Sequence, residues 1–221
     1  MAIVRALAFT LLAAFSLSCA AAPFGVRLGA ERVVLDAPPG FADTLDLGSP
    51  RLLELAEALT SASNRILLFA LTDADLRRFT LGDTPELHRY LLLSTPRAAE
   101  RDHMSPARFK AFAAESMRGL GNPVQPADIR KQLDAQPQGR ATLLWELRRA
   151  PDAVSILEGT RLPMKPDAQP HYLLSTTTLL LLRGKAISVA AFTVLRDDAD
   201  ADWLRAATER WVDDLLRLNA R

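Results

Sequence analysis

The end of the chain, residues 175–221, constrains the fold more than any other stretch. It contains parts of two apolar segments that are joined at Arg183-Gly184-Lys185. The first segment ends in four leucines, residues 179–182, and neither segment has a clearly polar face, which is typical of strands covered on both sides. Glycine adopts positive φ angles without steric cost, so we expect a β-hairpin with Gly184 at its apex and with Arg183 and Lys185 in water.

An amphipathic helix is predicted directly after this hairpin. An acidic run, residues 197–202, precedes it. Carboxylates in this position cap the free amides at a helix start and favour the positive end of its dipole. Since one side of the following segment is charged, we expect its apolar side to lie on the sheet. Apolar residues recur there at steps of three and four and define one buried stripe: Leu204, Ala207, Trp211, Leu215 and Leu218.

The same acidic run resembles a calcium-binding loop. Asp198, Asp200 and Asp202 alternate, and Glu209 follows at the spacing of the last calcium ligand. However, Trp203 occupies the place where such a loop needs glycine for its sharp turn, and the residues after it already follow the helical pattern. We therefore interpret the run as a helix cap, and we predict no metal site and no cofactor.

Residues 1–22 have the layout of a secretory signal peptide. One cation, Arg5, precedes an apolar run at residues 6–17, and small residues follow the run. The run is shorter than the ~20 residues that a membrane-spanning helix needs, which favours export over the alternative of an N-terminal anchor helix. We expect an exported protein of a Gram-negative bacterium, either periplasmic or an outer-membrane-anchored lipoprotein.

Cys19, the only cysteine, lies at the end of the apolar run. The small residue before it resembles a bacterial lipoprotein signal, although Ser16 stands where such signals usually carry leucine. If the signal is used, Cys19 is lipidated and becomes the first mature residue; otherwise it leaves with the signal peptide. In both cases the mature fold has no internal disulfide and no thiol nucleophile. Membrane contact is expected only through the leader or the lipidated Cys19.

Length and charge indicate that residues 23–221 form one neutral domain. The chain has 27 Lys and Arg and 26 Asp and Glu, and Arg5 belongs to the signal peptide, so 26 basic and 26 acidic residues remain. A neutral surface without a basic stripe argues against a nucleic-acid partner and against attraction to anionic lipid. About 200 residues are enough for a single domain with a full core.

Helices and strands alternate upstream of the hairpin. Capping residues predict helices that begin after Ser49, Thr72 and Ser105, and two of these caps are followed by proline. Residues 41–44 are expected to form a loop, and residues 141–149 are ambiguous between strand and helix. The order indicates an α+β fold with a mixed or mainly antiparallel sheet covered by helices, and with a C-terminal β-hairpin followed by an amphipathic helix. Apolar runs predict the upstream strands: residues 30–37, 65–71, 87–95 and 154–162.

Three features of this layout carry a family resemblance. They are the Pro39-Gly40-Phe41 element after a first short strand, the late hairpin, and the terminal helix that contains tryptophan. Over about two thirds of the mature chain the layout resembles the PsbP-like fold, which is shared by a photosystem II lumenal protein and by small exported bacterial lipoproteins of the DcrB type. No known functional residue of that family maps onto this sequence. The resemblance implies an accessory or structural protein of an exported compartment.

Three histidines, His88, His103 and His171, are the candidate catalytic groups. They are far apart in the sequence, and none lies in a metal-binding or catalytic motif such as HExxH. The chain also lacks a G-x-S-x-G motif around a serine nucleophile and a GxxxxGK[ST] phosphate loop. We therefore expect the histidines at surface or strand-edge positions, and a small exported hydrolase that uses a histidine and a carboxylate is the alternative.

The sequence thus predicts an exported, noncatalytic envelope protein with an accessory, binding or structural role. Its partner is expected to be an unknown envelope protein or a small ligand, and Arg183 and Lys185 at the hairpin apex are the candidate contacts. Besides the hydrolase, a second alternative is a carrier that holds a small apolar ligand between the sheet and its helices.

Overall fold

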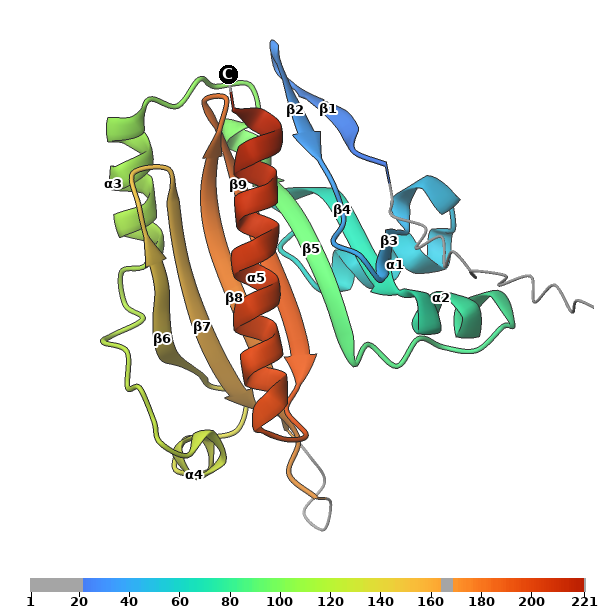
Figure 1. Cartoon of the computed structure of the whole chain (residues 1–221), viewed down its shortest axis with the longest axis vertical. Coiled ribbons are helices and arrows are strands. Elements are labelled where there is room, and N and C mark those ends of the chain that lie inside the picture. The colour runs from blue at the N-terminus through green and yellow to red at the C-terminus, as the bar shows by residue number, and fades with distance from the viewer. Residues whose placement is uncertain (1–21, 164–168, 221) are drawn as a thin grey trace, which may run out of the picture.

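The computed structural model describes residues 22–163 and 169–220 (Figure 1). Cys19 and almost the whole signal peptide lie outside this part of the chain, so their assignments stay predictions. The described helices are α1 (Pro50–Ala58), α2 (Asp73–Thr80), α3 (Pro106–Ser116), α4 (Ile129–Asp134) and α5 (Asp198–Asn219). The described strands are β1 (Phe24–Leu28), β2 (Glu31–Leu35), β3 (Phe41–Asp43), β4 (Asn64–Thr72), β5 (Arg89–Pro96), β6 (Ala141–Arg149), β7 (Ala153–Arg161), β8 (Tyr172–Leu182) and β9 (Lys185–Val194).

Strands β3 to β9 form one seven-stranded sheet in the order β3-β4-β5-β9-β8-β7-β6, and β1 and β2 form a separate hairpin. Every neighbouring pair in both sheets is antiparallel. The predicted α+β class is confirmed, with a C-terminal hairpin, β8–β9, followed by an amphipathic helix. Strands β8 and β9 lie in the middle of the sheet, as their apolar composition predicted.

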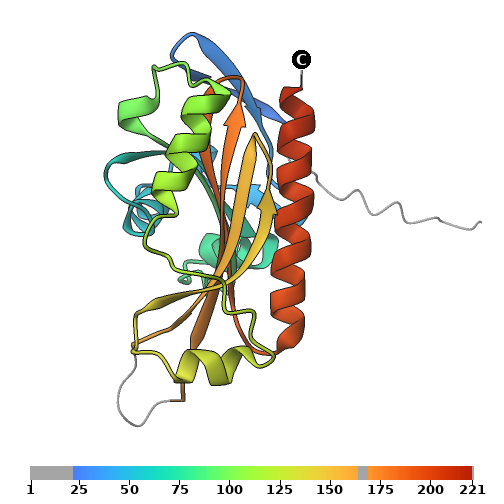
Figure 2. The same ribbon diagram turned by 90° about the vertical axis from the view of Figure 1, so that its left-hand side faces the viewer.

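The first face of the sheet is covered by α5 and by the β1–β2 hairpin (Figures 1 and 2). Leu204, Trp211 and Leu215 of α5 are buried there in one continuous core that also includes hairpin residues. The side chain of Asn219 binds the hairpin as a strand would: its Oδ1 accepts from Val34 N at 2.9 Å and its Nδ2 donates to Val34 O at 2.8 Å. The hairpin is therefore fixed to the C-terminal end of α5.

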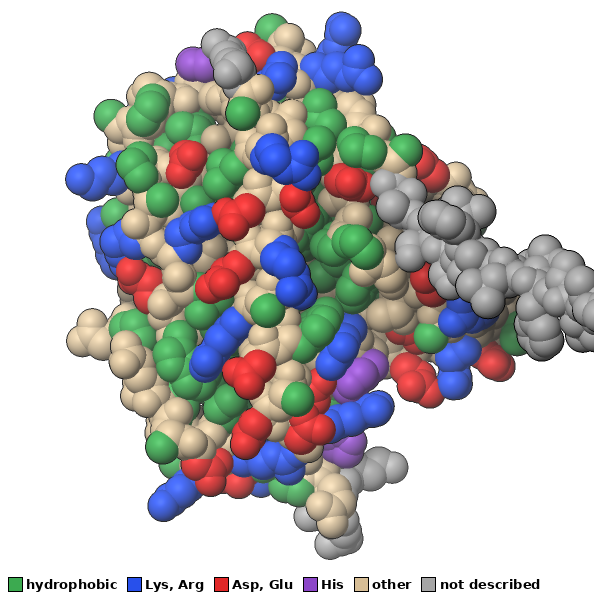
Figure 3. Space-filling view, viewed as in Figure 1, with side chains coloured by type: hydrophobic (Ala, Val, Ile, Leu, Met, Phe, Trp, Pro, Cys, Tyr) green, Lys and Arg blue, Asp and Glu red, His purple; other side chains and the backbone are tan. Residues whose placement is uncertain are grey.

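The helix start follows the predicted chemistry. Asp197 and Asp200 form a capping box, in which each side chain accepts from a backbone amide at the start of α5. Asp200 also accepts from Arg89 on β5, Nη2 to Oδ1 at 2.8 Å, although it is only 5% exposed. On the outer surface of α5, basic and acidic side chains alternate in Figure 3, so this side of the helix faces solvent as the sequence predicted.

The second face of the sheet is covered in two separate places. Helix α1 packs over β4 and β5 in one cluster, with Leu52 and Ala56 as its buried residues. Helix α3 packs over β7, β8 and β9 in another, with Phe109 and Ala113 as its buried residues. Figure 2 shows α3 and α5 on opposite sides of the sheet.

One predicted segment needs correction, and the structure decides another that the sequence left open. Residues 41–44 were expected to form a loop, but residues 41–43 are edge strand β3, where Ala42 pairs with Leu71 of β4. Asp43 and Thr44 are turn-forming residues, yet here Asp43 Oδ1 accepts from Phe69 N at 3.2 Å and so extends the pairing. The ambiguous residues 141–149 are strand β6, at the opposite edge.

Candidate functional site

The candidate site begins with helix α3. Ser105 caps the helix, with its Oγ accepting from Arg108 N at 3.3 Å, and Pro106 occupies the first turn, as the sequence predicted. Phe109 and Ala113 point toward the sheet and are 1% and 3% exposed. The side of α3 next to them carries alanines, including Ala114, which are too small to fill the space in front of the strands.

The turn between β6 and β7 forms the opposite wall. Ala150 N donates to Ala153 O at 2.7 Å and Ala153 N to Ala150 O at 3.4 Å, which closes a tight turn that contains Pro151. Asp152 O accepts from Leu181 N of β8 at 2.8 Å and ties this turn to the middle of the sheet. The wall is thus held by backbone hydrogen bonds, whichever side chains it carries.

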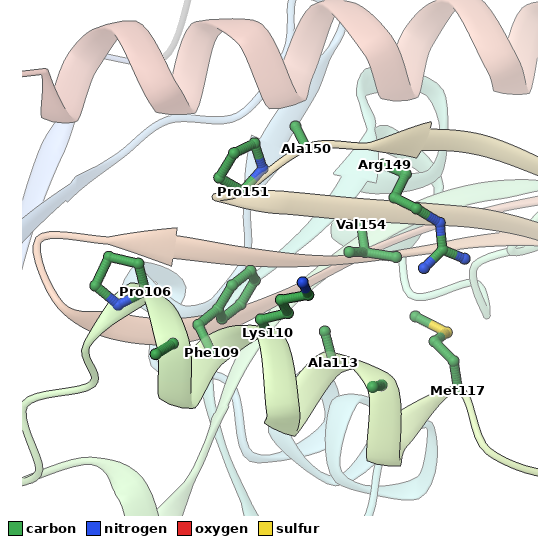
Figure 4. A pocket seen from close by; sticks show the side chains of 11 residues that line it. Pro106, Phe109, Lys110, Ala113, Met117, Arg149, Ala150, Pro151 and Val154 are labelled. Atoms are coloured by element: carbon green, nitrogen blue, oxygen red, sulfur yellow. The ribbon is translucent and has the colours of Figure 1, made fainter.

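Between α3 and this turn lies a groove of about 590 Å³ (Figure 4). Its size is within the ~300–1,000 Å³ that is usual for small-molecule sites. Apart from two cations, its walls are apolar. The groove is lined by Pro106, Ala107, Phe109, Lys110, Ala113, Ala114, Met117, Arg149, Ala150, Pro151 and Val154.

The two cations, Lys110 and Arg149, come from opposite walls. Figure 4 shows both side chains reaching into the space between α3 and the strands. Arg149 Nε donates to Glu146 Oε1 at 2.8 Å, and this hydrogen bond lowers the pKa of Glu146 below its ordinary value. Lys110 has no carboxylate partner among the described residues. One cation is therefore paired with a surface acid and the other is available to an anionic group.

A second hollow, of about 420 Å³, lies at the other end of the sheet. It brings together His88, before β5, and His171, before β8, and Glu86 is also in its lining. Two histidines lie close together in the lower part of Figure 3. Burial lowers the pKa of His88, and the nearby Arg196 cation lowers it further.

The second hollow contains two histidines and a carboxylate, as the hydrolase alternative requires, but no hydrogen bond between histidine and carboxylate is found among the described residues. His171 Nδ1 lies 2.8 Å from Gln169 O, and neither His88 nor His171 is hydrogen-bonded to a carboxylate among the described residues. The described lining of this hollow contains no serine, threonine or cysteine. A base held in place by an acid beside a nucleophile is what such chemistry needs.

His103 lies elsewhere, on the β8–β9 turn. Gly184 has φ of +73°, as expected for the hairpin apex, and a Cβ at this position would be 2.3 Å from the His103 ring. Glycine is therefore required here both for the turn and for the approach of the imidazole. All three histidines lie at surface or strand-edge positions, as predicted. The sequence did not indicate that His88 and His171 share the second hollow.

The expectation that both hairpin cations stay in water is wrong for Lys185. Its side chain is buried, 2% exposed, and Nζ donates to the backbone carbonyls of Glu100 at 3.1 Å and Asp102 at 2.6 Å. Lys185 thus holds the segment before α3 and presents no contact surface. Arg183 is half-buried at the turn with φ of 50°.

Neither a metal centre nor a membrane span is found in residues 22–163 and 169–220. These residues contain no group of three or more His, Cys, Asp or Glu placed to hold a metal ion. The acidic run at the start of α5 serves as the helix cap instead. Within the same ranges, no helix is both long and apolar enough to cross a membrane.

Comparison with known proteins identifies no family for this chain. No protein-family model matches the chain, and no curated protein matches it. A solved structure that it resembles is the Ran-binding protein Mog1p of Saccharomyces cerevisiae, with 13% identity, 90% of this chain and 93% of that chain covered, and a TM-score of 0.37. We derive nothing about this chain from a likeness at that level. The resemblance to PsbP-like proteins stays a prediction.

The sequence predicted one wall of the groove, helix α3, but neither the opposite wall nor the groove itself. The predicted helix after Ser105 is α3, and Phe109 and Ala113 form its buried side. The sequence did not indicate that this helix lies opposite Pro151, because the two are brought together by strand pairing in the sheet. Alanine in a helix is too common to signal a cavity.

Proposed function

We propose that this protein is an exported, noncatalytic binding protein whose groove between α3 and the β6–β7 turn takes an apolar chain with an anionic end group. The groove itself carries the proposal, since nine of its eleven lining residues are apolar and the other two are cations. This joins two of the functions predicted from the sequence, the binding protein of an exported compartment and the carrier of a small apolar ligand.

The chemistry of the lining supports an amphiphile over a wholly apolar ligand. An apolar chain gains free energy when it leaves water for a surface formed by residues such as Phe109, Met117 and Val154. Met117 is unbranched and adapts its shape to different chains. A carboxylate at the end of that chain meets Lys110, and it competes with Glu146 for Arg149.

The predicted signal peptide supports the same function from another direction. A long-chain amphiphile is poorly soluble in an aqueous compartment between membranes, so a protein that covers its chain increases the amount that can cross. The exposed position of Ala107, Ala114 and Pro151 leaves the groove open to solvent along one side, and a chain can therefore enter without unfolding of the sheet.

Binding of palmitate to the purified chain without residues 1–22 tests the proposal. We expect saturable binding by calorimetry, and we expect Ala114→Phe, which fills the groove, to weaken it by about tenfold or more. Ala111→Phe is the matched control, because Ala111 is an exposed alanine of the same helix outside the groove. Palmitate that binds Ala114→Phe as well as the unchanged chain, or that does not bind at all, would falsify the proposal.

Hexadecanol tests the role of the cations. It has the same chain as palmitate but no charge, so we expect the unchanged protein to bind palmitate several times more tightly. The double variant Lys110→Gln/Arg149→Gln is expected to remove this preference and to keep hexadecanol binding. Equal affinities of the unchanged protein for palmitate and hexadecanol would show that the groove does not recognise an anionic end group.

A further inference from the structure

The hollow that contains His88 and His171 is built where three strand ends meet. Val194 N at the end of β9 donates to His88 O at 3.0 Å, and Leu195 N donates to Tyr172 O at 2.9 Å. These hydrogen bonds fix His88 and Tyr172, the residue that follows His171, against the same segment. The two imidazoles are thus placed by the sheet, although they come from distant parts of the sequence.

Two permanent cations complete the lining. Arg130 of α4 donates through Nη2 to the carbonyl oxygen of Arg196, and its guanidinium lies 5.8 Å from the centre of the Tyr172 ring. One of its five N–H groups is used in that hydrogen bond, so others are available to a ligand. Arg196 forms no ion pair with a carboxylate among the described residues.

The acids near the hollow already have partners. Glu86, the one carboxylate in the described lining, forms an ion pair with Arg78 at 2.8 Å. Asp200 accepts from Arg89 and from the backbone amides of Arg196 and Asp197. Their charges are therefore largely balanced by groups other than the two arginines and two histidines that face the hollow.

We propose that this hollow is a second binding site, for a phosphate group, held by Arg130, Arg196, His88 and His171. Each guanidinium group offers paired N–H donors to phosphate oxygens. His88 offers a ring N–H donor even when neutral, whereas His171, whose Nδ1–H is directed at Gln169 O, offers its Nε2–H when protonated. The site is separate from the groove under α3. The groove adjoins the first residues of β7, and this hollow adjoins the first residues of β8, which pair with the opposite end of β7.

Calorimetric titration of the chain without residues 1–22 with inorganic phosphate tests this site. We expect Arg196→Gln to weaken binding by about fivefold or more, as loss of a charged hydrogen-bond donor does. It is the cleanest variant, since the neighbouring interactions of Arg196 use its backbone atoms. Arg101→Gln is the control, an exposed arginine outside this hollow, and it is expected to bind as the unchanged chain does.

Sulfate distinguishes protonation of the histidines from protonation of the anion. Phosphate changes its own charge in the pH range in which imidazole titrates, whereas sulfate does not. The charged groups around His88 are Arg89, Arg196, Asp200 and Glu86, and Arg130 and His171 line the same hollow. An anion stabilises imidazolium, so sulfate is expected to bind more tightly as the pH falls from about 7.5 to 5.5. In His88→Gln/His171→Gln this pH dependence should be lost.

The phosphate group can belong to a small molecule or to a lipid headgroup. Vesicles of phosphatidylcholine with and without phosphatidylglycerol distinguish these sources. Binding of inorganic phosphate without vesicle binding supports a small ligand, and vesicle binding that depends on phosphatidylglycerol and on Arg196 supports a headgroup. If neither binds, or if Arg101→Gln lowers affinity as much as Arg196→Gln, the site does not exist. Failure here leaves the palmitate result untouched, because the two sites share no residue.

Discussion

The two faces of the seven-stranded sheet are covered in different ways. On one face, α5 and the β1–β2 hairpin bury a single continuous core. On the other, α1 and α3 bury two separate clusters, and polar residues such as Glu158 and Ser175 stand on the same face. Burial raises the pKa of Glu158, since the carboxylate has lost water there without gaining a described partner.

This difference assigns stability to one face of the sheet and binding to the other. A continuous core couples its members, so loss of one contact weakens the whole face. A face divided between two short helices leaves helix edges uncovered, and the groove lies at one such edge, beside α3. We infer that the face covered by α5 determines the global stability of the domain, and that the face covered by α1 and α3 can open or adapt at lower cost.

The largest expected effect tests this inference with two matched leucines. Leu204 of α5 and Leu52 of α1 are 0% and 1% exposed, one on each face. Leu204→Ala is expected to lower the free energy of unfolding by about 4 to 5 kcal/mol, the upper part of the range for buried leucine, because its surroundings cannot collapse into the cavity. Leu52→Ala is expected to cost about 2 to 3 kcal/mol, because α1 can shift on its own.

Urea unfolding followed by circular dichroism measures both values, and hydrogen exchange shows where the protection is lost. For Leu52→Ala we expect faster exchange in α1 and β4 and little change in α5. Equal costs for the two variants, with exchange raised across the whole sheet in both, would mean that the two faces are one cooperative unit and that the contrast between them is only geometric.

A medium effect is expected at Lys185, which joins the continuous face to the segment before α3. Lys185→Met keeps most of the volume but leaves the carbonyls of Glu100 and Asp102 without their donor. Loss of such a buried donor should cost about 2 kcal/mol. The Met104 amide, which donates to Gly184 O at 2.8 Å, reports on this segment by hydrogen exchange. Unchanged stability together with unchanged Met104 protection would show that the ammonium contributes nothing.

The parts of the fold that could be predicted are those specified by neighbouring residues. The apolar runs of β8 and β9, the Asp197 cap and the Ser105-Pro106 start all act within a few residues of themselves. Strand β3 could not be predicted, because three residues are too few for periodicity. Lys185 was misplaced because its acceptors, Glu100 and Asp102, are more than eighty residues away in the sequence.

Both candidate sites depend on strand order. His88 and His171 share a hollow because β5 and β8 each pair antiparallel with β9, so the two strands run in the same direction and begin at the same edge. A prediction that β9 lies between β5 and β8 would have placed His88 and His171 close together. The groove under α3 depends in the same way on where the β6–β7 turn lies, and composition does not contain that information.

The smallest expected effect concerns Asp200, at the start of α5 on the continuous face. Burial raises its pKa, but hydrogen bonds from Arg89 and from the amides of Arg196 and Asp197 outweigh this, and the pKa lies below the ordinary value of 3.8. A carboxylate with a lowered pKa stabilises the fold fully above its unfolded pKa and loses that contribution as the pH falls through its folded pKa. Asp200→Asn should therefore cost about 1 kcal/mol at neutral pH, because Asn keeps an acceptor oxygen but loses the charge that strengthens the hydrogen bond from Arg89.

The pH dependence of that cost distinguishes charge from shape. We expect the difference in unfolding free energy between Asp200→Asn and the unchanged chain to be constant from about pH 7 to pH 4 and to shrink below that, as Asp200 becomes protonated. Glu209→Gln on the exposed side of α5 is the control, and it should change neither the unfolding free energy nor its pH dependence. If the Asp200→Asn difference persists undiminished at about pH 2.5, the carboxylate acts through its shape and hydrogen-bond geometry, and the helix start then adds no charge-dependent stability to the continuous face.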